Sequence, residues 1–210
     1  MLLRSRFDMN ARTSREVAAQ PYGIVAVASS AGGITALRSV LGELPAAFPV
    51  PVVVVQHLDP RHETIIAEVI GRRTRLETKL AVAGEQVRPA TIHIAPPDRH
   101  LLVEADGILQ LSRRKQVHFV RPSADLLFES VAGSYGSTTL ACVLTGSGSD
   151  GARGAMAVKS RGGTVIVQDP ESAEFDGMPR AAIDAGAADH VVPLGKISDV
   201  ILGLVEATAS

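Results

Sequence analysis

Short runs of aliphatic, largely β-branched residues recur along the chain, separated by stretches in which apolar residues fall at helical spacing. Continuous apolar runs are typical of strands buried on both faces of a parallel sheet. They predict strands at 23–28, 51–56, 91–95, 139–144, 164–167 and 190–194, with a further short strand at 79–83. The helical spacing predicts helices at 34–41, 62–72, 124–135, 152–160, 178–185 and 197–205. This alternation predicts an α/β fold, a three-layer α/β/α sandwich with a mostly parallel sheet.

One segment departs from the alternation. The apolar runs 100–104 and 108–111 flank Ala105-Asp106-Gly107. Two apolar runs around a short loop that contains glycine are typical of a β-hairpin. We therefore expect a small antiparallel hairpin beside the parallel sheet.

The sequence gives information on the N-terminus of the chain and on the N-terminus of the predicted helix 124–135. Residues 1–20 are polar and mixed in charge, so we expect a flexible N-terminal tail followed by a single domain at 21–207. Ser123 directly precedes the predicted helix 124–135, with Asp125 in its first turn. This pattern predicts that Ser123 caps the helix N-terminus.

The composition excludes several classes of protein. The 210 residues are 46% hydrophobic but only 3% aromatic, so aliphatic side chains must fill the core. A net charge of -1 gives no field that would attract nucleic acid or an anionic membrane surface. No apolar run approaches the roughly 20 residues of a membrane span. The single cysteine, Cys142, lies within a predicted strand, so we expect a small core residue and a reducing, cytoplasmic compartment.

The segment 23–41 is central to the predicted function. A buried strand is followed by the small residues of the turn Ser29-Ser30-Ala31-Gly32-Gly33 and then by a helix. In open parallel sheets, ligands lie at the carboxyl ends of the strands, where the free N–H groups of a new helix can hold a negative oxygen. This unit alone is compatible with an oxyanion site, with a phosphate-binding turn or with an ordinary tight turn.

Three predicted strands end in complementary side chains, namely Ser30, His57 and Asp150. If these strands are neighbours, a hydroxyl, an imidazole and a carboxylate meet in one crevice, which predicts a hydrolytic triad. Ser30 would be the nucleophile, His57 the general base, and Asp150 the group that orients the imidazole. The backbone N–H groups around Ala31-Gly32 are the candidate oxyanion donors. The alternative for each is ordinary: a helix cap for Ser30 and for Asp150, and a turn residue for His57.

The other histidines give no sign of a metal site. His93 lies inside a predicted strand and is expected to be packed rather than reactive. His62, His100, His118 and His190 lack the spacing typical of metal ligands, and a single cysteine offers no zinc cluster. We therefore expect no metal site.

Six short motifs occur in order along the chain. They are Ala28-Ser29-Ser30-Ala31-Gly32-Gly33, Gln56-His57, Ile94-Ala95-Pro96-Pro97-Asp98-Arg99-His100, Arg121-Pro122-Ser123-Ala124-Asp125-Leu126-Leu127-Phe128, Leu144-Thr145-Gly146-Ser147-Gly148-Ser149-Asp150-Gly151-Ala152 and Gly177-Met178-Pro179-Arg180. Together they resemble the catalytic domain of the CheB-type chemotaxis protein-glutamate methylesterase family. The resemblance covers about Tyr22 to Leu194.

The resemblance implies hydrolysis of glutamate γ-methyl esters on the cytoplasmic helical bundle of chemoreceptors, with release of methanol. It also implies deamidation of receptor glutamines, a parallel α/β fold with a small hairpin, and no cofactor. The family's triad falls on Ser30, His57 and Asp150. The family commonly has Thr where this chain has Ala31 and Met where it has Ser147. Both positions line the active site in the family, so substrate fit and rate are expected to differ.

Typical members also carry an N-terminal receiver domain, whereas about twenty residues precede the domain here. We therefore expect a stand-alone esterase that is either open or controlled by a partner, such as a methyltransferase or a separate regulator. A phosphate- or nucleotide-binding signalling module, a catalytically weak scaffold and a hydrolase of another ester are the alternatives. Against nucleotide binding, Ile34-Thr35 stands where a phosphate-binding lysine would follow the glycines, and the second strand ends in Gln56-His57 rather than an acidic residue.

Overall fold

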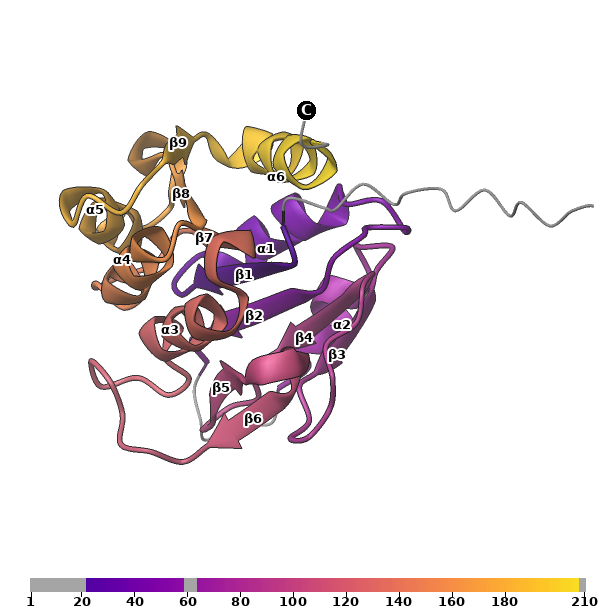
Figure 1. Cartoon of the computed structure of the whole chain (residues 1–210). Helices are drawn as coiled ribbons and strands as arrows, with labels where there is room; N and C mark the ends of the chain where they lie inside the picture. Colours follow the sequence, from indigo (N-terminus) through magenta and orange to yellow (C-terminus); the bar gives the residue numbers. More distant parts are fainter. Residues whose placement is uncertain (1–21, 59–63, 208–210) are drawn as a thin grey trace, which may run out of the picture.

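The computed structural model describes residues 22–58 and 64–207 and shows a three-layer α/β/α sandwich (Figure 1). The strands are β1 (Ile24–Ser29), β2 (Val52–Gln56), β3 (Glu77–Leu80), β4 (Thr91–Ile94), β5 (His100–Val103), β6 (Leu109–Ser112), β7 (Thr139–Val143), β8 (Thr164–Gln168) and β9 (His190–Val192). The helices are α1 (Gly33–Gly42), α2 (Ile66–Gly71), α3 (Ala124–Tyr135), α4 (Ala152–Ser160), α5 (Gly177–Asp184) and α6 (Ile197–Glu206). Short 3₁₀ turns lie at Ala105–Gly107, Gly136–Thr138, Pro170–Ser172 and Leu194–Lys196.

The main sheet is parallel throughout, with the strand order β3-β4-β2-β1-β7-β8-β9. The chain builds outward from β1 through β2 and then returns to the other side of β1 with β7. The strand order therefore reverses around β1. In open parallel sheets such a switch point opens a crevice at the carboxyl ends of the strands, where ligands bind.

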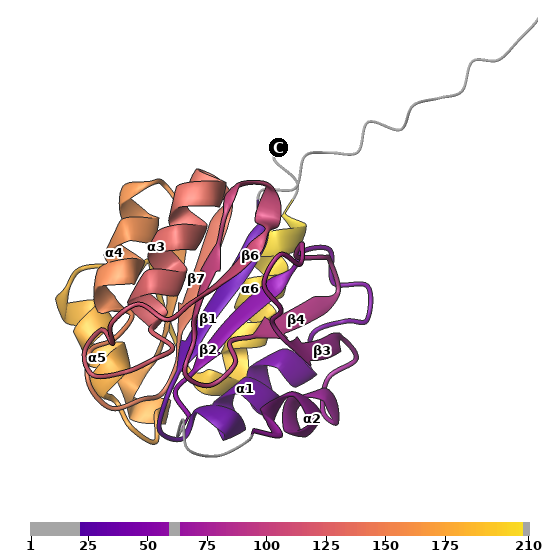
Figure 2. The same ribbon diagram turned by 90° about the horizontal axis from the view of Figure 1, so that it is seen from below.

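Both faces of the sheet are covered, as Figure 2 shows. Helices α1, α2 and α6 pack on one face, while α3, α4 and α5 pack on the other together with the β5–β6 hairpin. Within β1, Ala26 and Ala28 face the α3 side, and Val25 and Val27 face the α1 side. Every residue of β1 is buried, which explains why its sequence is continuously apolar rather than alternating.

The predicted fold class is confirmed, and the differences lie at element ends. The strand expected at 79–83 runs over Glu77–Leu80; it is a partly exposed edge strand and lacks the apolar run of a buried one. The helix expected at 62–72 spans Ile66–Gly71, and residues 62 and 63 lie outside the described part of the chain. The last strand ends at Val192, because Pro193 leads into a 3₁₀ turn. Cys142 is fully buried, and burial raises the pKa of its thiol to about 12, as expected for a core residue.

No helix within residues 22–58 and 64–207 combines the length and the apolarity needed to cross a bilayer.

Several side chains in the core are both buried and polar. One of them, His93 on β4, is fully buried, and its Nδ1 lies 3.8 Å from Oε2 of Glu85. Its predicted packed role is confirmed.

We expect His93→Gln to reduce the loss of stability in mild acid. Burial lowers the pKa of His93 below 6.5, although Glu85 opposes the shift. Below pH 6.5 the unfolded chain therefore binds a proton that the native chain resists, so the free energy of unfolding falls as the pH decreases. The slope contributed by one such group is at most about 1.4 kcal/mol per pH unit.

Urea denaturation of wild type and His93→Gln between pH 7 and pH 5 measures this slope. Buried His100, whose pKa burial also lowers, keeps part of the slope in the variant. The exposed His190 provides the control, and His190→Gln should follow wild type. Equal slopes for wild type and His93→Gln would contradict the prediction.

Candidate active site

The predicted site residues lie at the carboxyl ends of adjacent strands. β1 and β2 pair in register, with Ser29 opposite Gln56, and the backbone N–H of His57 donates to the Ser29 carbonyl at 3.1 Å. Ser30 and His57 are the next residues along their strands, so the strand pairing itself brings them together. β7 flanks β1 on the other side, and the loop that follows it carries Asp150.

The turn after β1 holds Ser30 at the start of α1. Gly32, the N-cap residue of α1, has a φ of 73°, which lies in the left-handed region that favours glycine. The amide of Gly33 donates to the Ser30 carbonyl at 2.9 Å, closing the turn. Among the described residues, none accepts a hydrogen bond from the amides of Ala31 and Gly32. These two N–H groups are therefore available to a negative oxygen beside Ser30.

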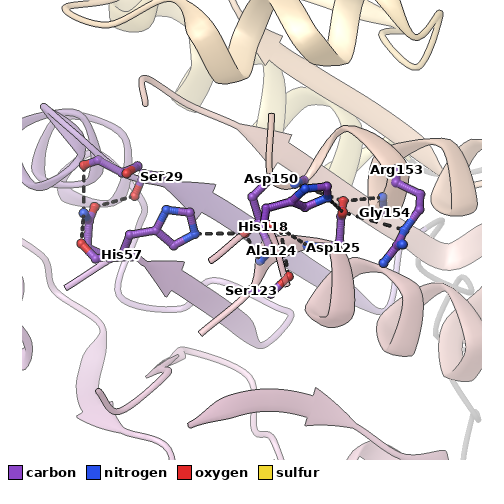
Figure 3. A network of polar contacts seen from close by, with 12 residues as sticks. Ser29, His57, His118, Ser123, Ala124, Asp125, Asp150, Arg153 and Gly154 are labelled. Atoms are coloured by element: carbon purple, nitrogen blue, oxygen red, sulfur yellow. Dashed lines mark hydrogen bonds and ion pairs between the residues drawn. The ribbon is translucent and has the colours of Figure 1, made fainter. Parts of the chain in front are cut away.

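His57 and Asp150 form a close pair. Nε2 of His57 lies 2.9 Å from Oδ2 of Asp150, and the two side chains are 12% and 4% exposed. The imidazole lies between the end of β1 and Asp150 (Figure 3). Because a carboxylate can only accept, Nε2 must carry the proton, and in the neutral ring Nδ1 is then the basic nitrogen. Within the described chain no hydrogen bond joins Ser30 to the His57 ring; catalytic contacts of this kind often close only when substrate binds.

Asp150 is a fixed carboxylate. Besides His57, it accepts from the Ser123 hydroxyl at 2.8 Å and from the backbone amides of Ala124 at 2.6 Å and Asp125 at 3.2 Å. Burial alone would raise the pKa of Asp150, but the hydrogen bonds from His57, Ala124 and Ser123 outweigh it and lower the pKa below 3.8. Asp150 is therefore ionised at neutral pH and accepts the Nε2 proton of His57.

The role expected for Ser123 is wrong in one respect. Ser123 occupies the N-cap position of α3, but its hydroxyl makes no capping bond. It donates to Asp150 instead, because the N-terminus of α3 points its free amides at that carboxylate. This contact was not predicted from the sequence, because the motif Arg121-Pro122-Ser123-Ala124-Asp125 marks the segment but does not identify Asp150 as the partner.

Asp125 extends this network away from His57 (Figure 3). Its Oδ1 accepts from the amides of Gly151 at 2.9 Å and Gly154 at 2.8 Å, at the N-terminus of α4. Its Oδ2 faces Nε2 of His118 at 3.3 Å and Nε of Arg153 at 3.7 Å. Asp125 thus ties α3 to the loop that carries Asp150.

Ser147, predicted to line the site, is exposed in the loop between β7 and α4. It borders a surface cavity of about 460 Å³ together with residues of the 173–177 loop. A smaller cavity of about 90 Å³ is lined by His57, Leu58, Gln116, Phe119, Val120 and Arg121. Among the described residues, no group of three or more His, Cys, Asp or Glu side chains is arranged to hold a metal ion.

Comparison with known proteins identifies the family. The family profile described as CheB methylesterase matches residues 25–201, most of the chain. The chain belongs to the CheB methylesterase family. The crystal structure of the Thermotoga maritima CheB methylesterase catalytic domain matches with a TM-score of 0.85 at 40% sequence identity, covering 88% of this chain and 99% of that one.

Curated relatives of the CheB family agree with this assignment. A putative protein-glutamate methylesterase/protein-glutamine glutaminase of Leptospira interrogans is 37% identical over 183 residues, covering 87% of this chain and 95% of the relative. The protein-glutamate methylesterase/protein-glutamine glutaminase of Thermotoga maritima is 40% identical over 185 residues, covering 87% of this chain and 54% of the relative. This chain therefore matches nearly all of one relative and about half the length of another.

Proposed function

We propose that this protein is a serine esterase that hydrolyses glutamate γ-methyl esters on the cytoplasmic helices of chemoreceptors and also deamidates receptor glutamines. One observation carries the proposal: a buried His57–Asp150 pair follows the strand next to Ser30, whose turn has two amides with no acceptor among residues 22–58 and 64–207. Membership of the CheB methylesterase family and the names of its curated relatives supply the substrate class.

The proposed mechanism uses each of these groups in turn. Nδ1 of His57 takes the proton of the Ser30 hydroxyl as its oxygen attacks the ester carbonyl. The amides of Ala31 and Gly32 hold the negative oxygen of the tetrahedral intermediate, and Asp150 stabilises the charged His57 ring. His57 then gives the proton to the leaving methoxy group, and methanol departs. Water repeats the cycle on the acyl-enzyme, releasing the glutamate carboxylate and restoring Ser30.

A phosphate-binding role for the same turn is less well supported. A Cβ built on Gly32 would lie 2.7 Å from Oε2 of Glu174, so this carboxylate stands close to the N-terminus of α1. Its negative charge opposes a phosphate at this place, because like charges in close contact repel. The ester or amide substrate is neutral when it binds, and the single negative charge of its tetrahedral intermediate is repelled less than the roughly two charges of a phosphate.

The partner that we propose is a methylated chemoreceptor in the cytoplasm, with a methyltransferase or a separate regulator as further partners. We also propose residues 21–207 as the catalytic domain; the tail expected at 1–20 lies outside the described residues. The family membership supports the receptor, and large apolar side chains near the site support a protein substrate. Phe119, which borders the cavity beside His57, is 94% exposed, and Phe175, beside Ser147, is 41% exposed.

We expect Phe119→Ala to weaken binding of a receptor fragment while leaving the chemistry intact. An exposed aromatic side chain beside a site is a typical anchor for a protein partner, and losing one costs about 1–2 kcal/mol, or about 5- to 30-fold in KM. The value of kcat should stay within about twofold of wild type. Steady-state kinetics on a methylated receptor fragment provide the measurement. Val191→Ala, at an exposed residue of the edge strand β9, is the matched control, and equal KM values for the two variants would contradict the prediction.

Methanol release from a methylated receptor cytoplasmic fragment tests the proposed function. We expect wild type to release methanol in proportion to the loss of methyl groups, and Ser30→Ala to release none above background. Circular dichroism of both proteins shows that they are equally folded. A folded wild type that releases no methanol from several receptor fragments would overturn the proposal and favour another ester or the scaffold alternative.

A further inference from the structure

The buried side chain of Gln56 connects the ends of β1 and β2. Gln56 is the last residue of β2 and is 3% exposed. Its Nε2 donates to the backbone carbonyl of Ser30 at 2.8 Å and to that of His57 at 2.9 Å. One amide group therefore holds the main chain of the proposed nucleophile and of the proposed base at the same time.

The chemistry of the partners fixes the orientation of this amide. Backbone carbonyls can only accept hydrogen bonds, so the atom that faces both of them must be the NH₂ group. The amide oxygen then faces Ser29, whose hydroxyl donates to Oε1 at 2.7 Å. Ser29 is fully buried, so its hydroxyl has this oxygen in place of water. Together the two side chains form a pair in which each donor meets an acceptor.

The glycine at position 33 leaves room for the Gln56–Ser29 pair. A Cβ built on Gly33 would lie 2.1 Å from Oε1 of Gln56 and 2.8 Å from Oγ of Ser29. Any larger residue at this position would push the amide away from the two carbonyls. Gly33 is the first residue of α1 and directly follows the turn that carries the candidate oxyanion amides, so the start of this helix packs directly on the Gln56–Ser29 pair.

We infer that Gln56 is a positioning residue that sets the distance between the Ser30 hydroxyl and the His57 ring. This inference rests on the proposed roles of Ser30 and His57. Both carbonyls that Gln56 holds belong to these residues, so a shift of either strand end moves the proton donor relative to the base. Misplacement by about 1 Å costs on the order of 100-fold in rate, because proton transfer needs close contact.

Gln56→Met tests the inference, because methionine has a similar volume but no hydrogen-bond donor and only a weakly accepting sulfur. We expect kcat for methanol release to fall about 10- to 100-fold while KM stays within about twofold. The rate at which a fluorophosphonate probe labels Ser30 should fall by a similar factor. Labelling needs no receptor, so it separates the two proposals. A wild type that labels at Ser30 but releases no methanol would refute the proposed substrate and still allow the inference to be judged.

Gln168 provides a matched control at the end of β8. It is fully buried, its Oε1 accepts from the Thr145 amide at 2.8 Å, and its Nε2 donates to the Ser172 carbonyl at 2.9 Å. Gln168→Met therefore loses similar bonds, none of them made to Ser30 or His57 themselves, although its partner Thr145 accepts from the Ser30 amide at 3.0 Å. We expect similar losses of stability in urea for the two variants but a change of kcat within about threefold for Gln168→Met. The inference would be overturned if the probe labelled Gln56→Met at the wild-type rate, or if kcat fell by the same factor in both variants.

A second variant decides the case if Gln56→Met does not fold. Ser29→Ala removes the hydroxyl that orients the amide and leaves the bonds from Nε2 in place. We expect a smaller loss in the same direction, about 3- to 10-fold in kcat and in the labelling rate, with KM unchanged. Wild-type values for Ser29→Ala would then overturn the inference.

Discussion

Ser30→Ala and His57→Ala are each expected to lower kcat/KM for methanol release by about 10⁴- to 10⁶-fold, and the double variant little further. Serine without the base is a weak nucleophile, and the base without serine has no hydroxyl to activate. Either loss therefore disables the same step. What remains in each variant is the contribution of substrate binding and of the oxyanion amides.

A double-mutant cycle on a methylated receptor fragment measures this prediction. The single variants should lose about the same factor, and the interaction term should cancel most of the second loss. Additive losses would mean that the two residues act in separate steps. Urea denaturation of all four proteins controls for folding.

Asp150→Asn is expected to lower kcat by about 10³- to 10⁴-fold. Asp150 accepts from His57, the Ser123 hydroxyl and the amides of Ala124 and Asp125. Asparagine replaces one accepting oxygen by an NH₂ group that must face some of these donors. If the NH₂ faces His57, Nε2 becomes the acceptor and Nδ1 carries the proton, so the ring cannot take the proton of Ser30.

The same substitution should destabilise the fold in a pH-dependent way. Because the pKa of Asp150 in the native state lies below 3.8, its carboxylate stabilises the fold fully above about pH 5, and the effect is lost as the pH falls below 3.8. Urea denaturation should therefore show a difference of about 1–3 kcal/mol between wild type and Asp150→Asn at pH 7, which shrinks in acid. A kcat within tenfold of wild type would contradict the proposed role, whatever the stability.

The fold could be predicted largely because its strands are buried on both faces. The runs at β1, β2, β7 and β8 are continuous and apolar, and this pattern indicates a parallel sheet between two layers of helices. The edge strand β3 gave no such signal, since its residues are at most half-buried and polar side chains are tolerated there. Its position two residues earlier than expected reflects this weak pattern.

The site could be predicted only at the level of strand ends. Ser30, His57 and Asp150 were selected because parallel strands bring their carboxyl ends together, and β1 does lie between β2 and β7. Their catalytic roles stay predictions. The Gln56 amide and the Ser123 hydroxyl were out of reach of the sequence, because their partners lie 26 and 27 residues away and depend on strand order.

The structure, and not the sequence, also shows which ring nitrogen of His57 is placed to act as the base. The sequence predicts that His57 and Asp150 interact, but not that Nε2 of the ring carries the proton. The distance of 2.9 Å between Nε2 and Oδ2 of Asp150 assigns Nδ1 as the base. This assignment depends on the orientation of the His57 side chain at the end of β2.

The central claim is that Ser30 is a nucleophile activated by His57, and the site of covalent labelling tests it most directly. After reaction with a fluorophosphonate, peptide mass spectrometry identifies the modified residue, with Ser29 and Ser147 as internal comparisons in the same protein. We predict an adduct on Ser30 in wild type, little or none in His57→Ala, and none in Ser30→Ala. Labelling of Ser29 or Ser147 instead, or equal labelling of Ser30 with and without His57, would contradict the account.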